Sequence, residues 1–413
     1  MRNTVEFDVQ FARSQFPDTC WDWAFFENAG GAFVPTSVIQ RMTAYMSENQ
    51  VQPGATFGPS AKAQERMTLG HRLMAEMIGA DTDEVVIAAS TSINVYVLAQ
   101  ALRHQWQAGD EIVVTNLNHE ANSGPWRRLA EFGIKIVEWP VNPETAELDI
   151  DLLDRLLSDR TRLVVFPHVS NITGDINDVV QITDKAHDAG AMVCVDGVAY
   201  APHREADVKA WDVDFYLFSF YKVFGPHMGC LYGKRDRLLT ARGQYHYFIE
   251  EDQTSAKLNP AGPNHESIAC LAGIADYFDA LSTHHFPGQS DVLFDRVKGV
   301  YGVTADHEQK LAEKFIDFVN STSAIRLIGR NTADKSQRVA TFSILLDGLT
   351  SAAVPTAVQK ANVAISSGHF YAKRLIEALG IDDPDDGVIR CSLAHYNTEE
   401  EVNRLIQALD QLV

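Results

Sequence analysis

The chain has 413 residues, of which 46% are hydrophobic and 22% charged, and this composition is typical of a globular protein with more than one domain. Its formal net charge of −20 argues against nucleic acid or an anionic membrane as a partner, because either would repel it. The N-terminal segment has no apolar run of signal-peptide length, and no run reaches the length of a membrane span, so we expect a cytoplasmic protein.

The five cysteines are scattered and form no C-x-x-C pair. The sequence therefore predicts neither a disulfide framework nor a zinc knot. His168, His187 and His203 lack the spacing of a ligand motif such as H-E-x-x-H, so we predict no metal site.

Short apolar runs alternate with amphipathic stretches over roughly residues 20–262. The apolar runs show no in/out alternation, which is typical of strands in a parallel sheet that is covered on both faces. The predicted strands are 84–89, 111–115, 134–138, 162–166, 191–195, 214–218 and 229–232. The predicted helices between them are 92–104, 124–132, 149–156 and 176–189.

The pattern then changes to two long predicted helices, 264–281 and roughly 292–320. The remainder mixes predicted strands and a helix, at 340–346, 388–393 and 398–412. The sequence thus predicts an α/β chain with a large, mostly parallel-sheet domain over 20–283. A smaller α+β domain is predicted over 284–413, and we assign the N-terminal segment 1–19 to it.

Polar side chains follow several of the predicted strands, where the ligands of an open α/β sheet bind. Amides and imidazoles follow the strands 111–115 and 162–166, and a carboxylate, a hydroxyl and an amine follow the next two strands: Asn116, Asn118, His119, His168, Asn171, Asp196, Ser219 and Lys222. Each alone has an ordinary explanation, such as a loop histidine or the turn signal Asp196-Gly197. Their convergence on one edge of the sheet is harder to explain without a bound ligand.

Pyridoxal phosphate uses these residue types together. A lysine of lowered pKa forms a Schiff base with its aldehyde, and a carboxylate keeps its pyridine nitrogen protonated. A ring stacks on the cofactor face, and an amide contacts the phenolic oxygen. The phosphate needs backbone N–H groups at a helix N-terminus together with hydroxyls, and Ser90, Thr91 and Ser92 offer them after the strand 84–89. We therefore predict pyridoxal phosphate as the cofactor.

Five segments are similar, in order and spacing, to the class V aminotransferases of pyridoxal-phosphate fold type I, and within them to the cysteine desulfurases. They are "GDEIVVTNLNHEANSGPWRRLAEFG", "VVFPHVSNITGDIND", "AHDAGAMVCVDGVAYAPH", "DVDFYLFSFYKVFGPHMGCLYGK" and "VIRCSLAHYNTEEEVNRLIQAL".

This resemblance covers most of the chain and implies a role for each matching residue. The implied roles are a stacking ring (His119), a cofactor and substrate contact (Asn171), the partner of the pyridine nitrogen (Asp196), a phosphate ligand (Ser219), the Schiff-base lysine (Lys222) and the grip on the substrate carboxylate (Arg390). It also implies a homodimer with active sites at the subunit interface.

The chain departs from the desulfurase pattern at four positions. The loop cysteine that takes up the substrate sulfur is replaced by Tyr371, and a phenol cannot form a persulfide. A glutamine is replaced by Ala199, the histidine before the lysine by Tyr221, and a threonine that reaches the partner's phosphate by Gly262. The chain thus resembles a desulfurase-like subgroup that lacks the loop cysteine, and we count Tyr221 among the cofactor contacts.

Three functions stay open. The first is an enzyme that acts at the α-carbon of a small amino acid by transamination, β-elimination or racemisation, with Lys222 and His119 as its catalytic residues. The second is a C–S β-lyase or desulfurase that releases sulfide without a persulfide cysteine. The third is a binding module without catalysis, against which the presence of Lys222, Asp196, His119 and Arg390 argues.

Overall fold

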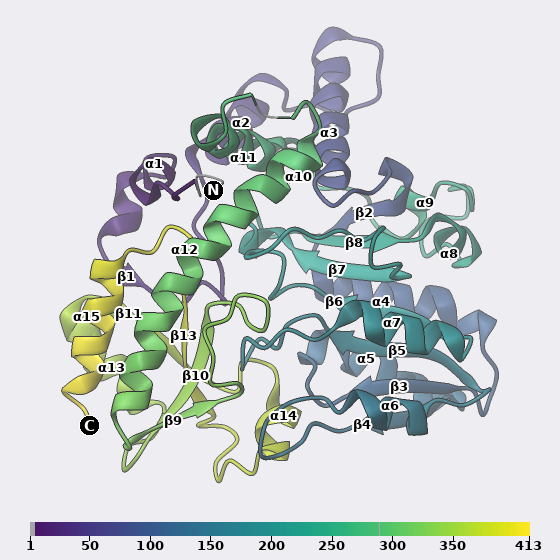
Figure 1. The fold of residues 1–413 in the computed structure, drawn as a ribbon. Helices are drawn as coiled ribbons and strands as arrows, with labels where there is room; N and C mark the ends of the chain where they lie inside the picture. The colour runs from purple at the N-terminus through teal and green to yellow at the C-terminus, as the bar shows by residue number, and fades with distance from the viewer. Residues whose placement is uncertain (1–4, 289) are drawn as a thin grey trace.

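The computed structural model describes residues 5–288 and 290–413, which are built around two sheets of different size (Figure 1). In these residues the larger sheet has seven strands, in the order β2-β8-β7-β6-β5-β3-β4. Their bounds are β2 (Val85–Ala88), β3 (Glu111–Thr115), β4 (Lys135–Trp139), β5 (Thr161–Pro167), β6 (Met192–Asp196), β7 (Phe215–Ser219) and β8 (Gly229–Gly233).

The predicted mostly parallel sheet is confirmed, with one reversal among the described strands. β8 runs antiparallel to both of its neighbours, β2 and β7. Its residues are buried along the whole strand, as are those of β7. A continuous apolar run indicates that both faces of a strand are covered, but it carries no information about the direction of the strand.

Helices cover both faces of the larger sheet, which explains why its strands show no in/out alternation. Val164 of β5 belongs to a core that includes α7 (Val179–Asp188), whereas the next residue, Val165, belongs to a second core that includes α4 (Thr91–Leu102). The other helices around this sheet are α3 (Gly58–Glu76), α5 (Gly124–Arg127), α6 (Ile150–Leu156), α8 (Arg235–Thr240) and α9 (Thr254–Lys257).

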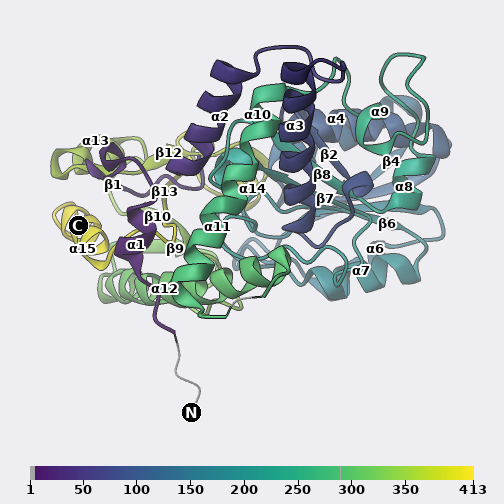
Figure 2. The same ribbon diagram turned by 90° about the horizontal axis from the view of Figure 1, so that it is seen from above.

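The predicted helix over 264–281 is two helices. Asn264 caps the first, α10 (His265–Cys270), and α11 (Ala272–His285) follows after a break at Leu271. The helices α2 (Thr36–Glu48), α3, α10 and α11 pack against one another (Figure 2). The sequence patterns did not predict α2. A short helix, α1 (Val9–Arg13), precedes this group in the chain.

The smaller sheet is antiparallel, and within the described residues it has four strands in the order β12-β13-β10-β9. The long helix α12 (Leu293–Ser321) and the C-terminal helix α15 (Glu399–Asp410) share a core with it. The remaining bounds in this part are β9 (Ile325–Ile328), β10 (Thr341–Leu346), β12 (Ser366–Gly368), β13 (Val388–Ser392), α13 (Ala353–Val358) and α14 (Lys373–Ala378).

An early segment of the chain joins this smaller part. β1 (Ala24–Phe25) pairs in parallel with β11 (Val363–Ala364), and the following residue, Phe26, lies in the core of the smaller sheet. The domain boundaries given above stay a prediction, and residues 1–4 of the predicted segment 1–19 lie outside the described residues.

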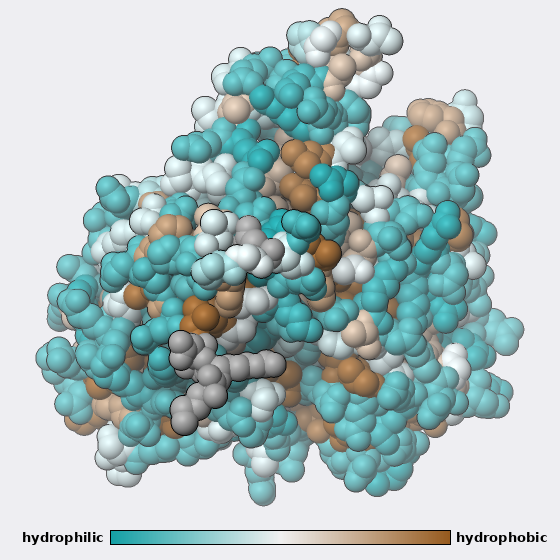
Figure 3. All heavy atoms as spheres, turned by 45° about the horizontal axis from the view of Figure 1, so that its top comes forward, coloured by the Kyte–Doolittle hydropathy of each residue, from teal (hydrophilic) through white to brown (hydrophobic). Residues whose placement is uncertain are grey.

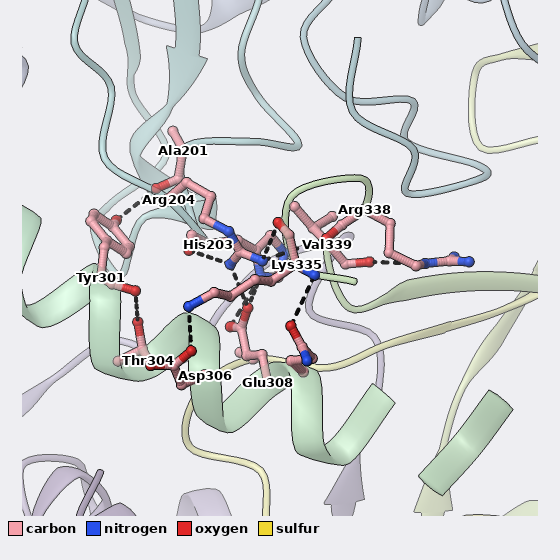
Figure 4. Close-up of polar contacts among 12 residues, drawn as sticks. Ala201, His203, Arg204, Tyr301, Thr304, Asp306, Glu308, Lys335, Arg338 and Val339 are labelled. Atoms are coloured by element: carbon pink, nitrogen blue, oxygen red, sulfur yellow. Dashed lines mark hydrogen bonds and ion pairs between the residues drawn. The ribbon is translucent and has the colours of Figure 1, made fainter. Parts of the chain in front are cut away.

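A buried ionic network connects α12 with loops of both parts (Figure 4). The Glu308 carboxylate accepts hydrogen bonds from Nδ1 of His203 at 3.0 Å and from Nη1 of Arg204 at 3.2 Å. Nη2 of Arg204 donates in turn to the carbonyl of Lys335 at 3.3 Å. Burial raises the pKa of Glu308, but His203 and Arg204 outweigh this effect and hold the pKa below its ordinary value, so the carboxylate is the charged centre of the network.

The molecular surface seen in Figure 3 is mainly hydrophilic, with hydrophobic residues in separate patches. No helix in residues 5–288 or 290–413 combines the length and the apolar character needed to cross a membrane.

Candidate active site

A cavity lies at the carboxyl ends of the central strands of the larger sheet, where ligands bind in folds of this class. Its volume is about 70 Å³. The nine residues predicted to contact a cofactor all line it: Ser90, Thr91, Ser92, His119, Asn171, Asp196, Ser219, Tyr221 and Lys222. Residues up to 132 positions apart in sequence, Ser90 and Lys222, thus meet in one place.

Lys222 stands at the end of a buried strand because the chain turns there into the cavity. β7 ends at Ser219, and a single 3-10 turn, η6 (Phe220–Lys222), carries the lysine to the cavity wall. Lys222 is 7% exposed, and within the described residues its ammonium group makes no hydrogen bond or ion pair. Burial, and to a smaller degree the positive charge of Arg390, lower its pKa from the ordinary lysine value to about 8. Such an amine is a competent nucleophile near neutral pH.

Asp196 is the last residue of β6 and lines the cavity. Its Oδ1 accepts a hydrogen bond from the backbone N–H of Val198 at 2.9 Å. Burial raises the pKa of Asp196, whereas this N–H and the charge of Lys222 lower it in part. A cation placed against the carboxylate would remove the remaining cost of its burial.

His119 is neutral at physiological pH. Burial lowers its pKa to about 3, and the charges of Lys222 and Arg390 act in the same direction. Its Nδ1 accepts a hydrogen bond from the backbone N–H of Ala121 at 3.0 Å, so the ring proton is carried by Nε2. This contact fixes the imidazole at the cavity wall, as a stacking ring requires.

The side chain of Asn171 reaches from the segment after β5 to the loop before α14. Its Nδ2 donates to the carbonyl of Phe370 at 2.9 Å, whereas its Oδ1 is buried and has no hydrogen-bond partner. A buried polar atom without a partner is costly, so an unpaired amide at a cavity wall indicates a site for a polar ligand.

One end of the cavity is formed by hydroxyl groups at the N-terminus of α4. Ser90 caps this helix by accepting from the N–H of Ile93 at 3.2 Å, and the hydroxyls of Thr91 and Ser219 lie 2.7 Å apart. Gly229 permits this approach, because a Cβ there would lie 2.3 Å from the backbone nitrogen of Thr91. The N-terminus of this 12-residue helix, together with the three hydroxyl groups, suits a phosphate group.

Arg390 lies beside the cavity on β13, and its side chain is 3% exposed. Its Nη1 donates to the carbonyl of Asn171 at 3.2 Å, and its Nη2 donates to Oε1 of Glu27 at 2.9 Å. The ring of Phe370 covers one face of the guanidinium at 3.7 Å. The sequence patterns did not single out Glu27 or Phe370.

Tyr371 does not enter the cavity. Its side chain is 71% exposed, its ring centroid lies 5.3 Å from that of His119, and its backbone carbonyl accepts from the N–H of Glu120 at 2.7 Å. Phe370 and Tyr371 both have a positive φ, at 45° and 59°, so the loop makes a tight reversal at the mouth of the site. None of the described residues lining the cavity is a cysteine, and Cys391 is buried in β13.

The residues present fit pyridoxal phosphate. The cavity offers an amine of lowered pKa, a buried carboxylate without a cationic partner in contact, an Asn171 amide nitrogen with a second N–H beyond the one that it gives to Phe370, and a hydroxyl-lined helix N-terminus. These are the four kinds of group that the aldehyde, the pyridine nitrogen, the phenolic oxygen and the phosphate require.

Comparisons with known proteins agree with this fit. The family model of aminotransferase class-V matches residues 24–285 and 299–405. The aminotransferase-like protein FGM3 of Gibberella zeae is 37% identical over 420 residues, which cover 100% of both chains. The cysteine desulfurase-like protein ustD of Aspergillus flavus is 35% identical over 98% of this chain and 91% of its own length. The crystal structure of the cysteine desulfurase CsdA of Escherichia coli matches with a TM-score of 0.81 and 26% identity, over 98% of each chain.

Proposed function

This chain belongs to the aminotransferase class V family, whose enzymes depend on pyridoxal phosphate, and we propose that it acts at the α-carbon of a small amino acid. The observation that supports this proposal most strongly is the surrounding of one amine. Lys222 is buried and has a lowered pKa, with the carboxylate of Asp196 in the same cavity and the guanidinium of Arg390 beside it.

When bound, pyridoxal phosphate supplies an aldehyde that links to an amine and a protonated ring that draws electrons from the α-carbon. Lys222 would hold the aldehyde through Nζ, as a Schiff base. Asp196 would hold the ring nitrogen by an ion pair, and His119 would stack on the ring. The second N–H of the Asn171 amide would donate to the phenolic oxygen.

The phosphate would lie at the N-terminus of α4. Ser90, Thr91 and Ser92 would hold it with hydroxyl and backbone N–H groups, and Ser219 would complete the hydroxyl set. Tyr221 lines the same cavity, and its ring is stacked on His227 at 4.8 Å, which supports a fixed orientation of its phenol. We therefore propose Tyr221 as a further cofactor contact.

Lys222 would also move the proton at the α-carbon of the substrate. A pKa of about 8 leaves both the amine and the ammonium populated near neutral pH, so Nζ can both accept and return a proton. Arg390 would bind the substrate carboxylate, with Asn171 beside it, and so orient the bonds of the α-carbon. A guanidinium suits a carboxylate because it can donate two parallel hydrogen bonds.

The outcome after removal of the proton stays open among transamination, racemisation and β-elimination. The second candidate is a C–S β-lyase or desulfurase that releases sulfide directly. The exposed phenol of Tyr371 and the lack of a cysteine among the described lining residues favour this version over persulfide transfer. The third candidate is a binding module without catalysis.

We further propose a homodimer and retain the expected cytoplasmic location. Tyr247 and Phe248 are 99% and 60% exposed, and they follow Tyr245, which lines a hollow of about 710 Å³ together with Gly262 and Pro263. Two large aromatic side chains left in water beside a hollow support an interface with a second copy.

A visible absorption spectrum of the purified protein, repeated during titration with amino acids, tests the proposal. We expect a band from the bound cofactor that shifts with at least one small amino acid. Pyruvate and sulfide formed from cysteine would favour the lyase, and a spectrum of the aminated cofactor would favour the aminotransferase. A protein whose band shifts with none of the amino acids would support the binding module instead.

A further inference from the structure

Arg390, the residue proposed to bind the substrate carboxylate, already has a carboxylate partner within the chain. Nη2 of Arg390 donates to Oε1 of Glu27 at 2.9 Å. Within the described residues the other oxygen of this carboxylate, Oε2, and the Nε of Arg390 are both buried without a hydrogen-bond partner. A single hydrogen bond thus joins the two side chains, and the Nε of Arg390 and the Oε2 of Glu27 stay without a partner.

The remaining surface of Arg390 leaves little room for a second carboxylate. Its Nη1 donates to the carbonyl of Asn171, and the ring of Phe370 covers one face. The Nε and Nη2 hydrogens point to the same side of a guanidinium, where they form the pair of donors that a carboxylate uses. Glu27 occupies half of this pair, so a substrate carboxylate cannot bind there in two-point fashion while Glu27 stays.

The backbone holds Glu27 in this place. The next residue, Asn28, donates from Nδ2 to the carbonyl of Ser392 at 2.8 Å, and its Oδ1 accepts from the hydroxyl of Tyr396. Glu27 itself forms an isolated bridge to Ser392 of β13, two residues beyond Arg390. The start of the glutamate side chain is therefore anchored to the same strand as the arginine.

Gly30 makes the space that the carboxylate fills. A Cβ at Gly30 would lie 2.4 Å from Oε1 of Glu27, so any larger residue there would displace the carboxylate. Gly30 has no positive φ, so the close contact, rather than the backbone conformation, accounts for the absence of a side chain.

The ion pair between Glu27 and Arg390 stabilises the buried guanidinium but leaves the buried carboxylate incompletely compensated. An unpaired guanidinium buried as deeply as that of Arg390 is costly, and Glu27 supplies its counter-ion before substrate binds. Glu27, however, is not well compensated. Burial raises its pKa, and the charges of Arg390 and Lys222 offset this effect only in part. Such a partner can be replaced by another carboxylate.

We infer that Glu27 is a specificity-determining residue that competes with the substrate carboxylate for Arg390. This inference rests on the role of Arg390 in the proposed function. A ligand must bring its own carboxylate to take the place of Glu27, so the site favours free acids over esters and amides. The affinity for a simple carboxylate is correspondingly low, because binding exchanges one ion pair for another.

The test is a calorimetric titration of the holoenzyme with propionate, a carboxylate that has no amine and so cannot react with the cofactor. Glu27→Gln removes the charge but keeps the side-chain length. Gly30→Ala keeps Glu27 but displaces its carboxylate. We expect both variants to bind propionate about tenfold more tightly than the wild type, a difference of about 1.4 kcal/mol. The matched control Glu138→Gln, which removes an exposed partner of Arg127, should bind as the wild type does.

Combination with Arg390→Ala shows whether the competition concerns Arg390. The gain from Glu27→Gln should disappear in the double variant. An unchanged or weaker affinity for propionate in Glu27→Gln would overturn the inference, as would a gain that persists without Arg390. The single variant Glu27→Gln should lower KM for an amino acid substrate with little change in kcat.

The titration separates this inference from the proposed function, because it requires no turnover. Tighter binding of propionate by Glu27→Gln, in a protein that leaves every amino acid unchanged, would sustain the competition at Arg390 while the proposed function fails. Turnover of an amino acid, with no effect of Glu27→Gln on either KM or propionate binding, would support the proposed function and overturn the competition at Arg390.

Discussion

The hydroxyl oxygens of Thr91 and Ser219 lie 2.7 Å apart, although the two residues are 128 positions apart in the chain. The Thr91 hydroxyl also lies 2.9 Å from the carbonyl of Phe218, to which it donates a hydrogen bond. One hydroxyl comes from the first turn of α4 and the other from the end of β7. The close approach of β8 at Gly229 holds the two elements together. The proposed phosphate site is therefore formed by the fold of the larger sheet rather than by a mobile loop.

Ser219→Ala should weaken the binding of pyridoxal phosphate. A hydrogen bond to a charged group contributes about 1.5–3 kcal/mol, so we expect a loss of about ten- to a hundredfold in affinity. Fluorescence titration of the apoprotein with the cofactor measures it. Ser47→Ala, on the exposed face of α2, serves as the control, and equal affinities of both variants would remove Ser219 from the site.

Incorporation of the cofactor should depend on pH through Lys222. Burial lowers the pKa of this group to about 8, and the amine reacts only when it is unprotonated. The rate at which the visible band grows, after pyridoxal phosphate is added to the apoprotein, should therefore rise with pH and reach half its maximum near about pH 8. Arg390→Gln removes a positive charge that lowers this pKa, so its midpoint should lie at higher pH. A rate that does not change between about pH 6.5 and about pH 9.5 would contradict the assignment.

Arg390→Ala should raise KM for the amino acid substrate. The variant removes the proposed partner of the substrate carboxylate, and we expect a rise of about ten- to a hundredfold from the loss of a charged hydrogen bond. Steady-state kinetics measure it, with the surface variant Arg155→Ala as the control. An unchanged KM would exclude Arg390 from the substrate site.

The proposed dimer should dissociate when charge is placed on its aromatic surface. Tyr247→Glu combined with Phe248→Glu would bury two carboxylates in the interface, a large cost for groups that are exposed in the single chain. Sedimentation velocity should show two chains for the wild type and one for the variant. A wild-type protein that sediments as a single chain over a range of concentrations would contradict the proposal.

The strands of the larger sheet were the most predictable part of the fold. β3 matches its predicted range of 111–115, and every residue of the strand is buried, as expected for a strand that is covered on both faces. The direction of β8 was not predictable from such a run. β12 (Ser366–Gly368) has three residues and no apolar pattern, since backbone pairing with β13 defines it.

The residues of the candidate site were predictable where they follow strands. Asp196 and Lys222 stand at the ends of buried runs, and a charged group in that position has few structural explanations. Glu27 could not be found in this way. It comes after β1, a strand of two residues, and its partner Arg390 is 363 residues away. Only the folded chain shows that the two meet.

The most direct test of the central claim is the exchange of the α-hydrogen of amino acids in D₂O, followed by proton NMR. We predict that the wild-type protein with pyridoxal phosphate exchanges the α-hydrogen of at least one small amino acid, such as alanine or cysteine. We predict no exchange by Lys222→Ala, which should keep the fold because Lys222 makes no hydrogen bond or ion pair within the described residues. Exchange by Lys222→Ala at the wild-type rate, or the lack of exchange for every amino acid tested, would contradict it.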